Sequence, residues 1–173
     1  MKTVHEYRTI DKSDWERGPW DDEPDKVQMV DEATGLPCLI VRGPVGALCG
    51  YVGVPEGHPW HGRHYDACGM GEKSENYDPN WYPNVHGGLT FADGCGHGDD
   101  PAKGICHIPA EGEPDNVWWL GFDCAHAGDR TDMSYSPAMR DRYPHHGDIY
   151  RGLEYVKAEC AKLAQQAIRA VNP

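Results

Sequence analysis

The sequence predicts an α+β fold, in which a mainly antiparallel β-sheet carries a C-terminal amphipathic helix packed on one face. Short runs of apolar and β-branched residues, separated by turns with glycine or proline, extend from residue 26 to residue 124 and indicate strands. After residue 150 the apolar residues recur at steps of three and four, which indicates a helix. Because 173 residues make about one domain, we assign residues 26–173 to a single α+β domain.

Residues 1–25 are predicted to form an N-terminal arm. They are mostly polar and charged, and the X-Pro pairs at residues 18–19 and 23–24 interrupt regular structure. Trp15 and Trp20 are the large apolar side chains of this segment. We therefore expect the arm to pack onto the domain through its tryptophans.

The strands follow in chain order. Turn residues bound each apolar run, and the expected strands are residues 26–30, 36–42, 47–54, 85–92, 104–108 and 117–124. The stretch 55–83 has no such run, and an irregular segment of this length inside a domain is usually functional or disordered.

The last element is the clearest. From residue 150 to residue 170 the apolar positions form one stripe at helical spacing: Leu153, Val156, Cys160, Leu163, Ala164, Ala167 and Val171. Charged and amide side chains occupy the remaining positions. The stripe predicts a helix that packs against the sheet.

Three expected strands have two contrasting faces, because successive strand side chains point to opposite sides. One face is apolar and suits the helix. The other collects polar and aromatic residues around glycines: Tyr51, His86, Thr90, Trp119 and Asp123. Glycine within a strand often marks the close approach of a ligand, and aromatic rings can stack on a heterocycle, so this face is predicted to be a ligand-binding floor. The alternative is an outer face that the N-terminal arm and the long loop cover.

Residues 121–129 carry the strongest candidate catalytic group. Asp123, His126 and Asp129 follow a strand end within a few residues of one another, and His86 joins them if its strand is adjacent. Imidazole and carboxylate together supply a general base and the group that orients it, or they bind a divalent metal ion. The alternative is turn capping by the aspartates and a surface hydrogen bond for the histidine.

Two further groups leave alternatives open. His61 and Arg63 lie in a histidine-rich loop, and they form either a lid that carries positive charge to a phosphate or solvated loop positions. The seven cysteines are odd in number and include no Cys-x-x-Cys pair, so reduced thiols are expected rather than a disulfide framework or a structural zinc.

Charge and hydropathy exclude several classes of partner. Acidic residues outnumber basic ones by 28 to 16, a net charge of −12, which disfavours binding to extended nucleic acid. No apolar run approaches the roughly 18 residues of a membrane span, and the first residues lack the apolar core of a signal peptide. A cytoplasmic location without membrane contact is expected, and the oligomeric state stays open.

Three segments resemble a known family: Gly50-Tyr51-Val52-Gly53-Val54-Pro55, Val85-His86-Gly87-Gly88-Leu89-Thr90-Phe91 and residues 119–129. They are similar to the hallmark segments of a bacteriophage and prophage family that has no assigned activity. The resemblance runs from about Trp15 to Leu163. It implies a phage accessory protein in the host cytoplasm, and by analogy an anti-defence protein that destroys or sequesters a nucleotide signal.

The leading hypothesis is a phosphodiesterase-like hydrolase of a small nucleotide, such as a cyclic dinucleotide immune signal. His86 and His126 are the acid and base candidates, and Asp123 and Asp129 orient them or hold a metal. The predicted ligand-binding residues are Tyr51, His61, Arg63, Thr90 and Trp119. The alternatives are a non-catalytic sponge for the same ligand and a protein whose aromatic face docks on a host partner.

Overall fold

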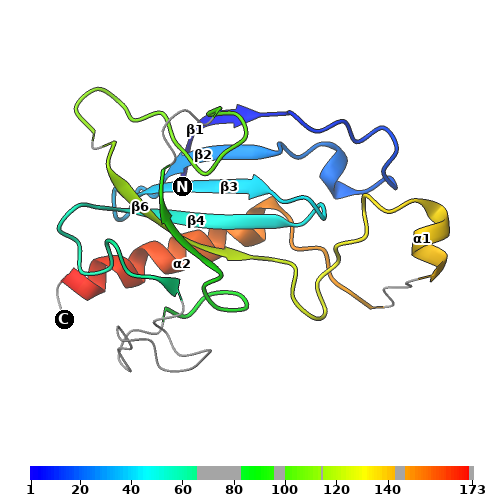
Figure 1. The fold of residues 1–173 in the computed structure, drawn as a ribbon. Helices are drawn as coiled ribbons and strands as arrows, with labels where there is room; N and C mark the ends of the chain where they lie inside the picture. The colour runs from blue at the N-terminus through cyan, green and yellow to red at the C-terminus, as the bar shows by residue number, and fades with distance from the viewer. Residues whose placement is uncertain (66–82, 96–99, 114, 143–146, 172–173) are drawn as a thin grey trace.

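The computed structural model describes residues 1–65, 83–95, 100–113, 115–142 and 147–171, and it shows the predicted α+β fold (Figure 1). Six antiparallel strands form one sheet in the order β1-β2-β3-β4-β6-β5. They are β1 (Lys2–Tyr7), β2 (Lys26–Val30), β3 (Pro37–Arg42), β4 (Leu48–Pro55), β5 (Phe91–Gly94) and β6 (Val117–Asp123). The helices are the 3-10 turn η1 (Pro19–Asp21), α1 (Pro137–Arg142) and α2 (Leu153–Val171).

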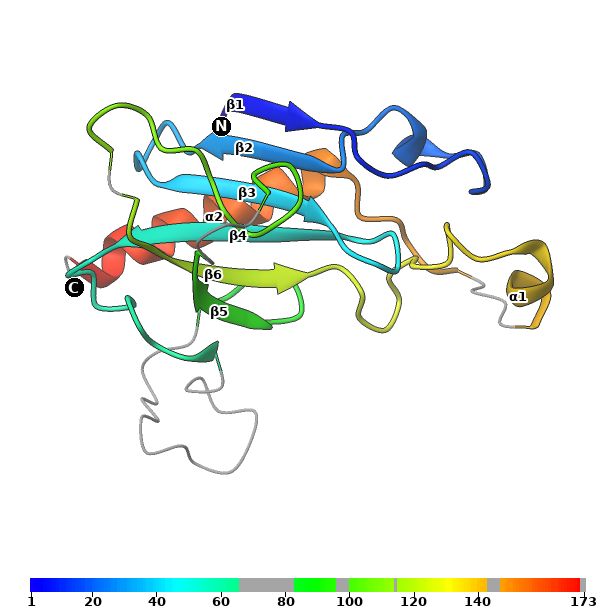
Figure 2. The ribbon, with the colours of Figure 1, turned by 45° about the horizontal axis from the view of Figure 1, so that its top comes forward.

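Helix α2 covers one face of the sheet, over β4 and β3 (Figure 2). Its buried side chains are Val156, Cys160, Leu163, Ala164 and Ala167, which confirms most of the predicted stripe. They pack on apolar residues of the strands, including Val52, Val54, Leu120 and Phe122. Val171, at the end of the stripe, is exposed instead.

The opposite face of the sheet is also covered, so the predicted open floor does not exist. Residues 100–113 cross this face in front of β2 and β3 (Figure 2). The buried amine of Lys26 donates to the carbonyls of Gly104 and Cys106, and the amide of Gln28 bonds both backbone groups of Ile108. Beneath them a second apolar cluster includes Leu39, Tyr51, Val117 and Trp119. The cover is this segment rather than the N-terminal arm.

Two expected strands are wrong in part or entirely. Residues 85–90 form a turn, because Gly87 and Gly88 take φ angles of 64° and 87°, which lie outside the strand region. Only Phe91–Gly94 pairs with β6. Residues 104–108 form no strand, since their backbone binds the side chains of β2 instead.

The N-terminal segment and the cysteines also differ from expectation. β1 joins the sheet as an edge strand, so the arm contributes to the domain, and Trp20 is buried as predicted. Cys95 and Cys106 form a disulfide with their Cα atoms 5.1 Å apart, whereas Cys38, Cys49, Cys124 and Cys160 are free thiols. Cys68 lies outside the described residues.

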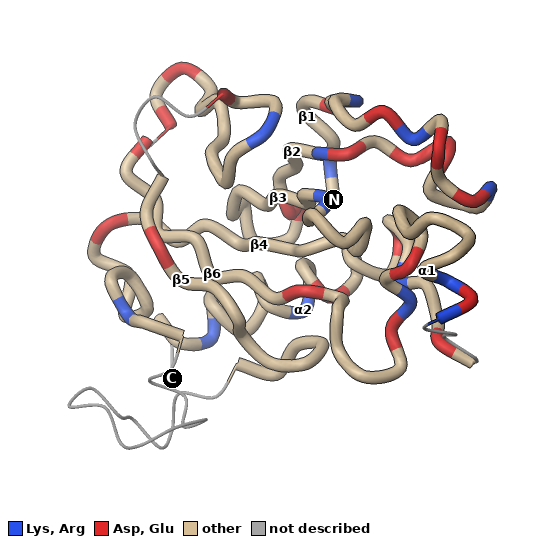
Figure 3. Tube along the Cα trace, turned by 45° about the vertical axis from the view of Figure 1, so that its right-hand side comes forward, with Lys and Arg blue, Asp and Glu red and all other residues tan. Residues whose placement is uncertain are grey.

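Charge is concentrated away from the middle of the sheet. Figure 3 shows acidic and basic residues along the N-terminal segment and the connecting loops, while β4 carries none. Within the part of the chain that the structure describes, no helix combines the length and apolar character needed to cross a bilayer.

Candidate functional site

All four predicted catalytic residues meet where the loop before β5, the loop after β6 and the first turns of α2 come together. Nε2 of His86 lies 2.6 Å from Oδ2 of Asp129, and Nδ1 of His86 lies 2.9 Å from the hydroxyl of Tyr155. The ring of His126 lies 5.6 Å from the ring of His86, and Oδ1 of Asp123 lies 3.5 Å from Nε2 of His126. The site therefore contains two imidazoles, each beside its own carboxylate.

The turn after β6 holds the two aspartates through local hydrogen bonds. Oδ1 of Asp123 accepts the backbone N–H of Ala125 at 2.9 Å, which is the Asx geometry that starts a turn. The N–H of His126 donates to Oδ2 of Asp129 at 3.1 Å, and the N–H of Asp129 donates to the carbonyl of His126 at 2.9 Å. The hydrogen bonds that cap this turn are therefore the same ones that hold the two carboxylates in position.

Asp129 is the most tightly held group of the site. Its side chain is 1% exposed, and it accepts bonds from His86, from the His126 N–H and, at 2.9 Å, from Nε of Arg151. Burial acts to raise the pKa of Asp129, but these three donors outweigh it and hold the pKa below its usual value. Asp129 is therefore an ionised acceptor at neutral pH.

The ionised carboxylate fixes the tautomer of His86. Because Oδ2 of Asp129 can only accept, Nε2 of His86 carries the proton of that bond. When Nδ1 carries no proton it is an acceptor, and the hydroxyl of Tyr155 can donate to it. The three residues form a chain in the order carboxylate, imidazole, hydroxyl.

Like His86, His126 turns its Nε2 toward a carboxylate, which here belongs to Asp123. Its Nε2 is covered, lacks a hydrogen-bond partner among the described residues and faces Asp123 at 3.5 Å. A Cβ built on Gly87 would come within 1.9 Å of this nitrogen, so a side chain at position 87 would displace the ring of His126. Nδ1 of His126 makes no hydrogen bond to the described residues and is the nitrogen left to meet a ligand.

Three residues of the site were not predicted: Arg151, Tyr155 and Glu159. They follow one another at intervals of four, so they line one side of α2 and the residues just before it. Glu159 accepts the backbone N–H of His86 at 2.8 Å, and the guanidinium of Arg151 lies 4.8 Å from the ring centre of Tyr155. This four-residue spacing beside the apolar stripe was the available signal.

The predicted ligand-binding residues do not gather here, with one exception. Tyr51 and Trp119 are 7% and 0% exposed within the second apolar cluster, so neither can stack on a ligand. Thr90 is exposed, and its N–H bonds the carbonyl of Gly121, two residues before Asp123. Of the five it is the one exposed residue near the catalytic candidates. The buried Tyr51 also lies close to Asp123, and burial together with Cys49 and Asp123 raises the pKa of its hydroxyl.

The predicted lid lies at the wrong end of β6. The ring of His61 is 5.9 Å from the ring of Trp118, and the carbonyl of Arg63 accepts the indole N–H of Trp118. Trp118 and Asp123 are five residues apart along the strand, about 17 Å at the usual rise. His61 and Arg63 therefore pack on Trp118 and do not close over the histidines.

Asp123, His126 and Asp129 do not form a metal site. Among the described residues no group of three or more His, Cys, Asp or Glu side chains is arranged to hold a metal ion. Both oxygens of Asp129 already accept hydrogen bonds from cationic or N–H donors. The imidazoles and carboxylates of the site suit proton transfer instead.

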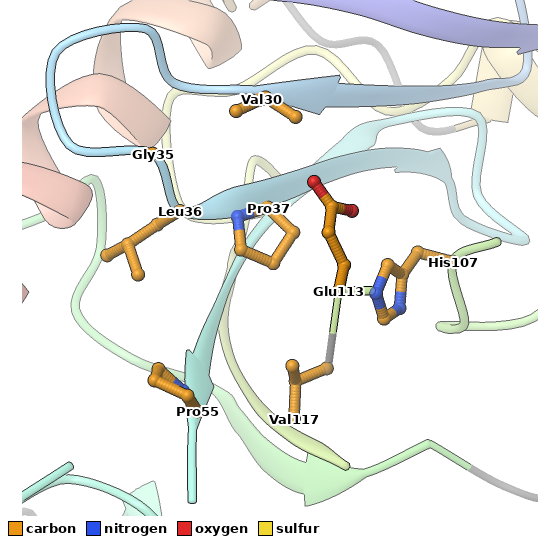
Figure 4. Close-up of a pocket in the computed structure, with 8 residues that line it drawn as sticks. All are labelled: Val30, Gly35, Leu36, Pro37, Pro55, His107, Glu113 and Val117. Carbon is orange, nitrogen blue, oxygen red and sulfur yellow. The ribbon is translucent and has the colours of Figure 1, made fainter. Parts of the chain in front are cut away.

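A separate pocket of about 130 Å³ lies elsewhere on the molecule (Figure 4). It is mainly apolar, with the side chains of His107 and Glu113 at one side, and its remaining lining residues are Val30, Gly35, Leu36, Pro37, Pro55 and Val117. None of these lining residues belongs to the site formed by His86, Asp123, His126 and Asp129.

Comparison with protein families, curated proteins and solved structures finds no match for this chain. The resemblance to phage proteins therefore stays a prediction.

Proposed function

We propose that this protein is an acid–base hydrolase that cleaves a phosphodiester bond in a small nucleotide. The observation that carries the proposal is the pair of imidazoles 5.6 Å apart, each with a carboxylate at Nε2. Hydrolysis of a diester needs a base on the side of the nucleophile and an acid on the side of the leaving group. Two histidines can hold opposite protonation states near neutral pH, and they can stand on either side of one phosphorus atom.

The carboxylates give the two histidines their roles. Asp129 holds the imidazolium that forms when His86 takes a proton, because the buried carboxylate is ionised and bonded to Nε2. Asp123 does the same for His126 from a longer distance and in a more exposed setting. His126 is 34% exposed at its side chain, which favours it as the partner of the leaving group and of water.

Arg151 is the cation available to the substrate. Its Nε donates to Asp129, while its two Nη groups make no hydrogen bond to the residues that the structure describes. A guanidinium with a free edge can bind two phosphoryl oxygens at once. Its neighbour Asp129 holds it in place.

The charge of the site limits the substrate. Asp123, Asp129 and Glu159 face Arg151, Nζ of Lys162 lies 3.4 Å from Oε2 of Glu159, and a protonated histidine adds one more positive charge. The site therefore has no excess of positive charge to offer a polyphosphate, and the whole chain carries a charge of −12. A diester with one negative charge per phosphate suits the site better, which supports the class that includes cyclic dinucleotides. A phage accessory protein that removes such a signal in the host cytoplasm is the proposed context.

A non-catalytic sponge for the same ligand is the second candidate. One observation favours it: both ring nitrogens of His86 are bonded within the protein, which is the arrangement of a structural histidine. A sponge would use Arg151 and His126 to hold the phosphate without turnover.

One experiment separates these functions. The protein is incubated with a panel of cyclic mononucleotides, cyclic dinucleotides and nucleoside triphosphates, products are separated by chromatography, and the protein is then heated to release retained ligand. We expect cyclic diesters to be cleaved and triphosphates to be left intact. His86→Asn and His126→Asn should each lower the rate by about 10²–10⁴-fold.

The matched control is His5→Asn, because His5 is an exposed histidine on β1 outside the site. It should keep the rate of the unmodified protein. Recovery of intact ligand after heating would identify a sponge instead. If no nucleotide is converted or retained, the proposal is overturned and docking on a host partner becomes the better explanation.

A further inference from the structure

The position of Tyr155 carries an inference that rests on the proposed function and deepens it. Nε2 of His86 is bonded to Asp129, and Nδ1 is bonded to the hydroxyl of Tyr155 at 2.9 Å. No ring nitrogen of His86 is left for a water or a substrate. Any proton that His86 exchanges with a substrate must therefore pass through the Tyr155 hydroxyl.

The surroundings of Tyr155 fit a reacting hydroxyl. Its ring stands edge-on to His86, with centroids 5.5 Å apart, and the guanidinium of Arg151 lies 4.8 Å from the ring centre. A cation at this position stabilises negative charge on the phenol oxygen. Burial, with Glu159 adding to it, raises the pKa of Tyr155 despite the opposing effect of Arg151, so the hydroxyl keeps its proton until a base removes it.

We propose that Tyr155 is the covalent nucleophile of this site, with His86 as its base and Asp129 as the group that orients the base. The order of hydroxyl, imidazole and carboxylate is the one by which enzymes activate a weak nucleophile. The substrate class is a phosphodiester of low charge. Tyr155 thereby becomes a catalytic residue, and Arg151 becomes the cation beside the reacting oxygen.

The reaction proceeds in two balanced steps. In the first, the Tyr155 oxygen attacks phosphorus, its proton passes to Nδ1 of His86, and the bond from phosphorus to the leaving oxygen breaks as that oxygen takes a proton from Nδ1 of His126. In the second, His126 takes a proton from water as the water oxygen attacks phosphorus. The bond from phosphorus to Tyr155 then breaks, and the phenol recovers its proton from His86. The sum is hydrolysis of one diester bond.

The test uses bis(p-nitrophenyl) phosphate, because p-nitrophenolate leaves without needing a proton. His126→Asn should therefore complete the first step and stall in the second, for lack of a base for water. We expect it to release about one equivalent of p-nitrophenolate in a burst. Intact-protein mass spectrometry and peptide mapping should then find the phosphoryl adduct on Tyr155.

Tyr155→Phe should show no burst in the His126→Asn background, and alone it should lower turnover by about 10³-fold or more. Tyr7→Phe, on β1 outside the site, is the matched control and should change neither. Thermal unfolding of each variant checks its fold, and the adduct on the His126→Asn protein is informative whether or not Tyr155→Phe folds.

The outcomes separate the two proposals. Turnover by the unmodified protein with no burst and no adduct in His126→Asn overturns the role of Tyr155 and leaves the hydrolase proposal standing. An adduct on another residue has the same meaning. If the unmodified protein cleaves neither this diester nor any nucleotide of the panel, the proposed function fails and the inference fails with it.

Discussion

Replacing Asp129 with asparagine removes the charge at the centre of the candidate site and keeps its shape. The amide can keep its oxygen at the Oδ2 position, where it still accepts from His86 and from the His126 N–H. Its NH₂ group then faces Nε of Arg151, and two donors meet at 2.9 Å. Asp129→Asn therefore loses one charge-assisted bond and weakens two others.

The expected cost follows from these three contacts. A hydrogen bond to a charged group contributes about 1.5–3 kcal/mol, and an ordinary one about 1 kcal/mol. Loss of the Arg151 bond is moderated because the arginine side chain is 26% exposed and can turn to water. With the two weakened bonds, we expect Asp129→Asn to lower the free energy of unfolding by about 2–4 kcal/mol at pH 7.

The cost should depend on pH in a defined direction. The pKa of Asp129 is lowered from 3.8 in the folded protein, so its stabilisation is full above pH 3.8 and is lost as the pH falls through the folded value. The difference between the unmodified protein and Asp129→Asn should thus shrink as the pH falls below about 4.

Urea unfolding followed by tryptophan fluorescence measures both quantities. Asp115→Asn is the matched control, since this exposed aspartate makes no side-chain hydrogen bond or ion pair with the residues that the structure describes, and it should change stability by less than about 0.5 kcal/mol. If Asp129→Asn is no less stable than the control at pH 7, the hydrogen bonds of Asp129 do not stabilise the fold and this account of the site is contradicted.

Two further predictions concern the loops. Gly87→Ala should displace His126 and lower the hydrolytic rate by more than the loss of folded protein at the assay temperature can explain. Gly57→Ala is the control, because Gly57 has a similar positive φ but open space around it. This second variant should lower stability without reducing the rate of the folded protein. Reduction of the Cys95–Cys106 disulfide, which closes a loop with a sequence separation of 11, should lower the free energy of unfolding by about 3 kcal/mol. An unchanged urea midpoint after complete thiol titration would contradict the second prediction.

The parts of the fold that could be predicted are those whose signal is local. The stripe of α2 and the apolar runs that form β2, β3, β4 and β6 each lie within one segment, so the sequence was sufficient for them. The cover of the second sheet face was missed because it depends on contacts between residues 80 positions apart, such as Gln28 with Ile108. Cys95 and Cys106 are only 11 positions apart, but spacing alone does not show which of seven cysteines form a pair.

The candidate site divides in the same way. Asp123, His126 and Asp129 lie in one turn and were identified together, and His86 followed from its polar strand-like setting. That setting was wrong, because residues 85–90 form a turn and His86 bonds the helix rather than joining a polar sheet face. Tyr155 could not be predicted because its partner His86 lies 69 positions away, and the helical spacing of α2 shows only which side of the helix is buried.

The N-terminal segment was expected only to pack onto the domain, but it also helps to position the residues of the site. Oε1 of Glu23 accepts the N–H of Leu153 at 2.8 Å and so caps the first turn of α2. Glu23 is held in turn by the buried Arg42 and by Tyr150, whose ring meets Trp20 edge-on. Arg151 and Tyr155 lie within one turn of this cap, so the segment that precedes β2 fixes the position of the cation and the hydroxyl relative to His86. The site is therefore assembled from both ends of the chain.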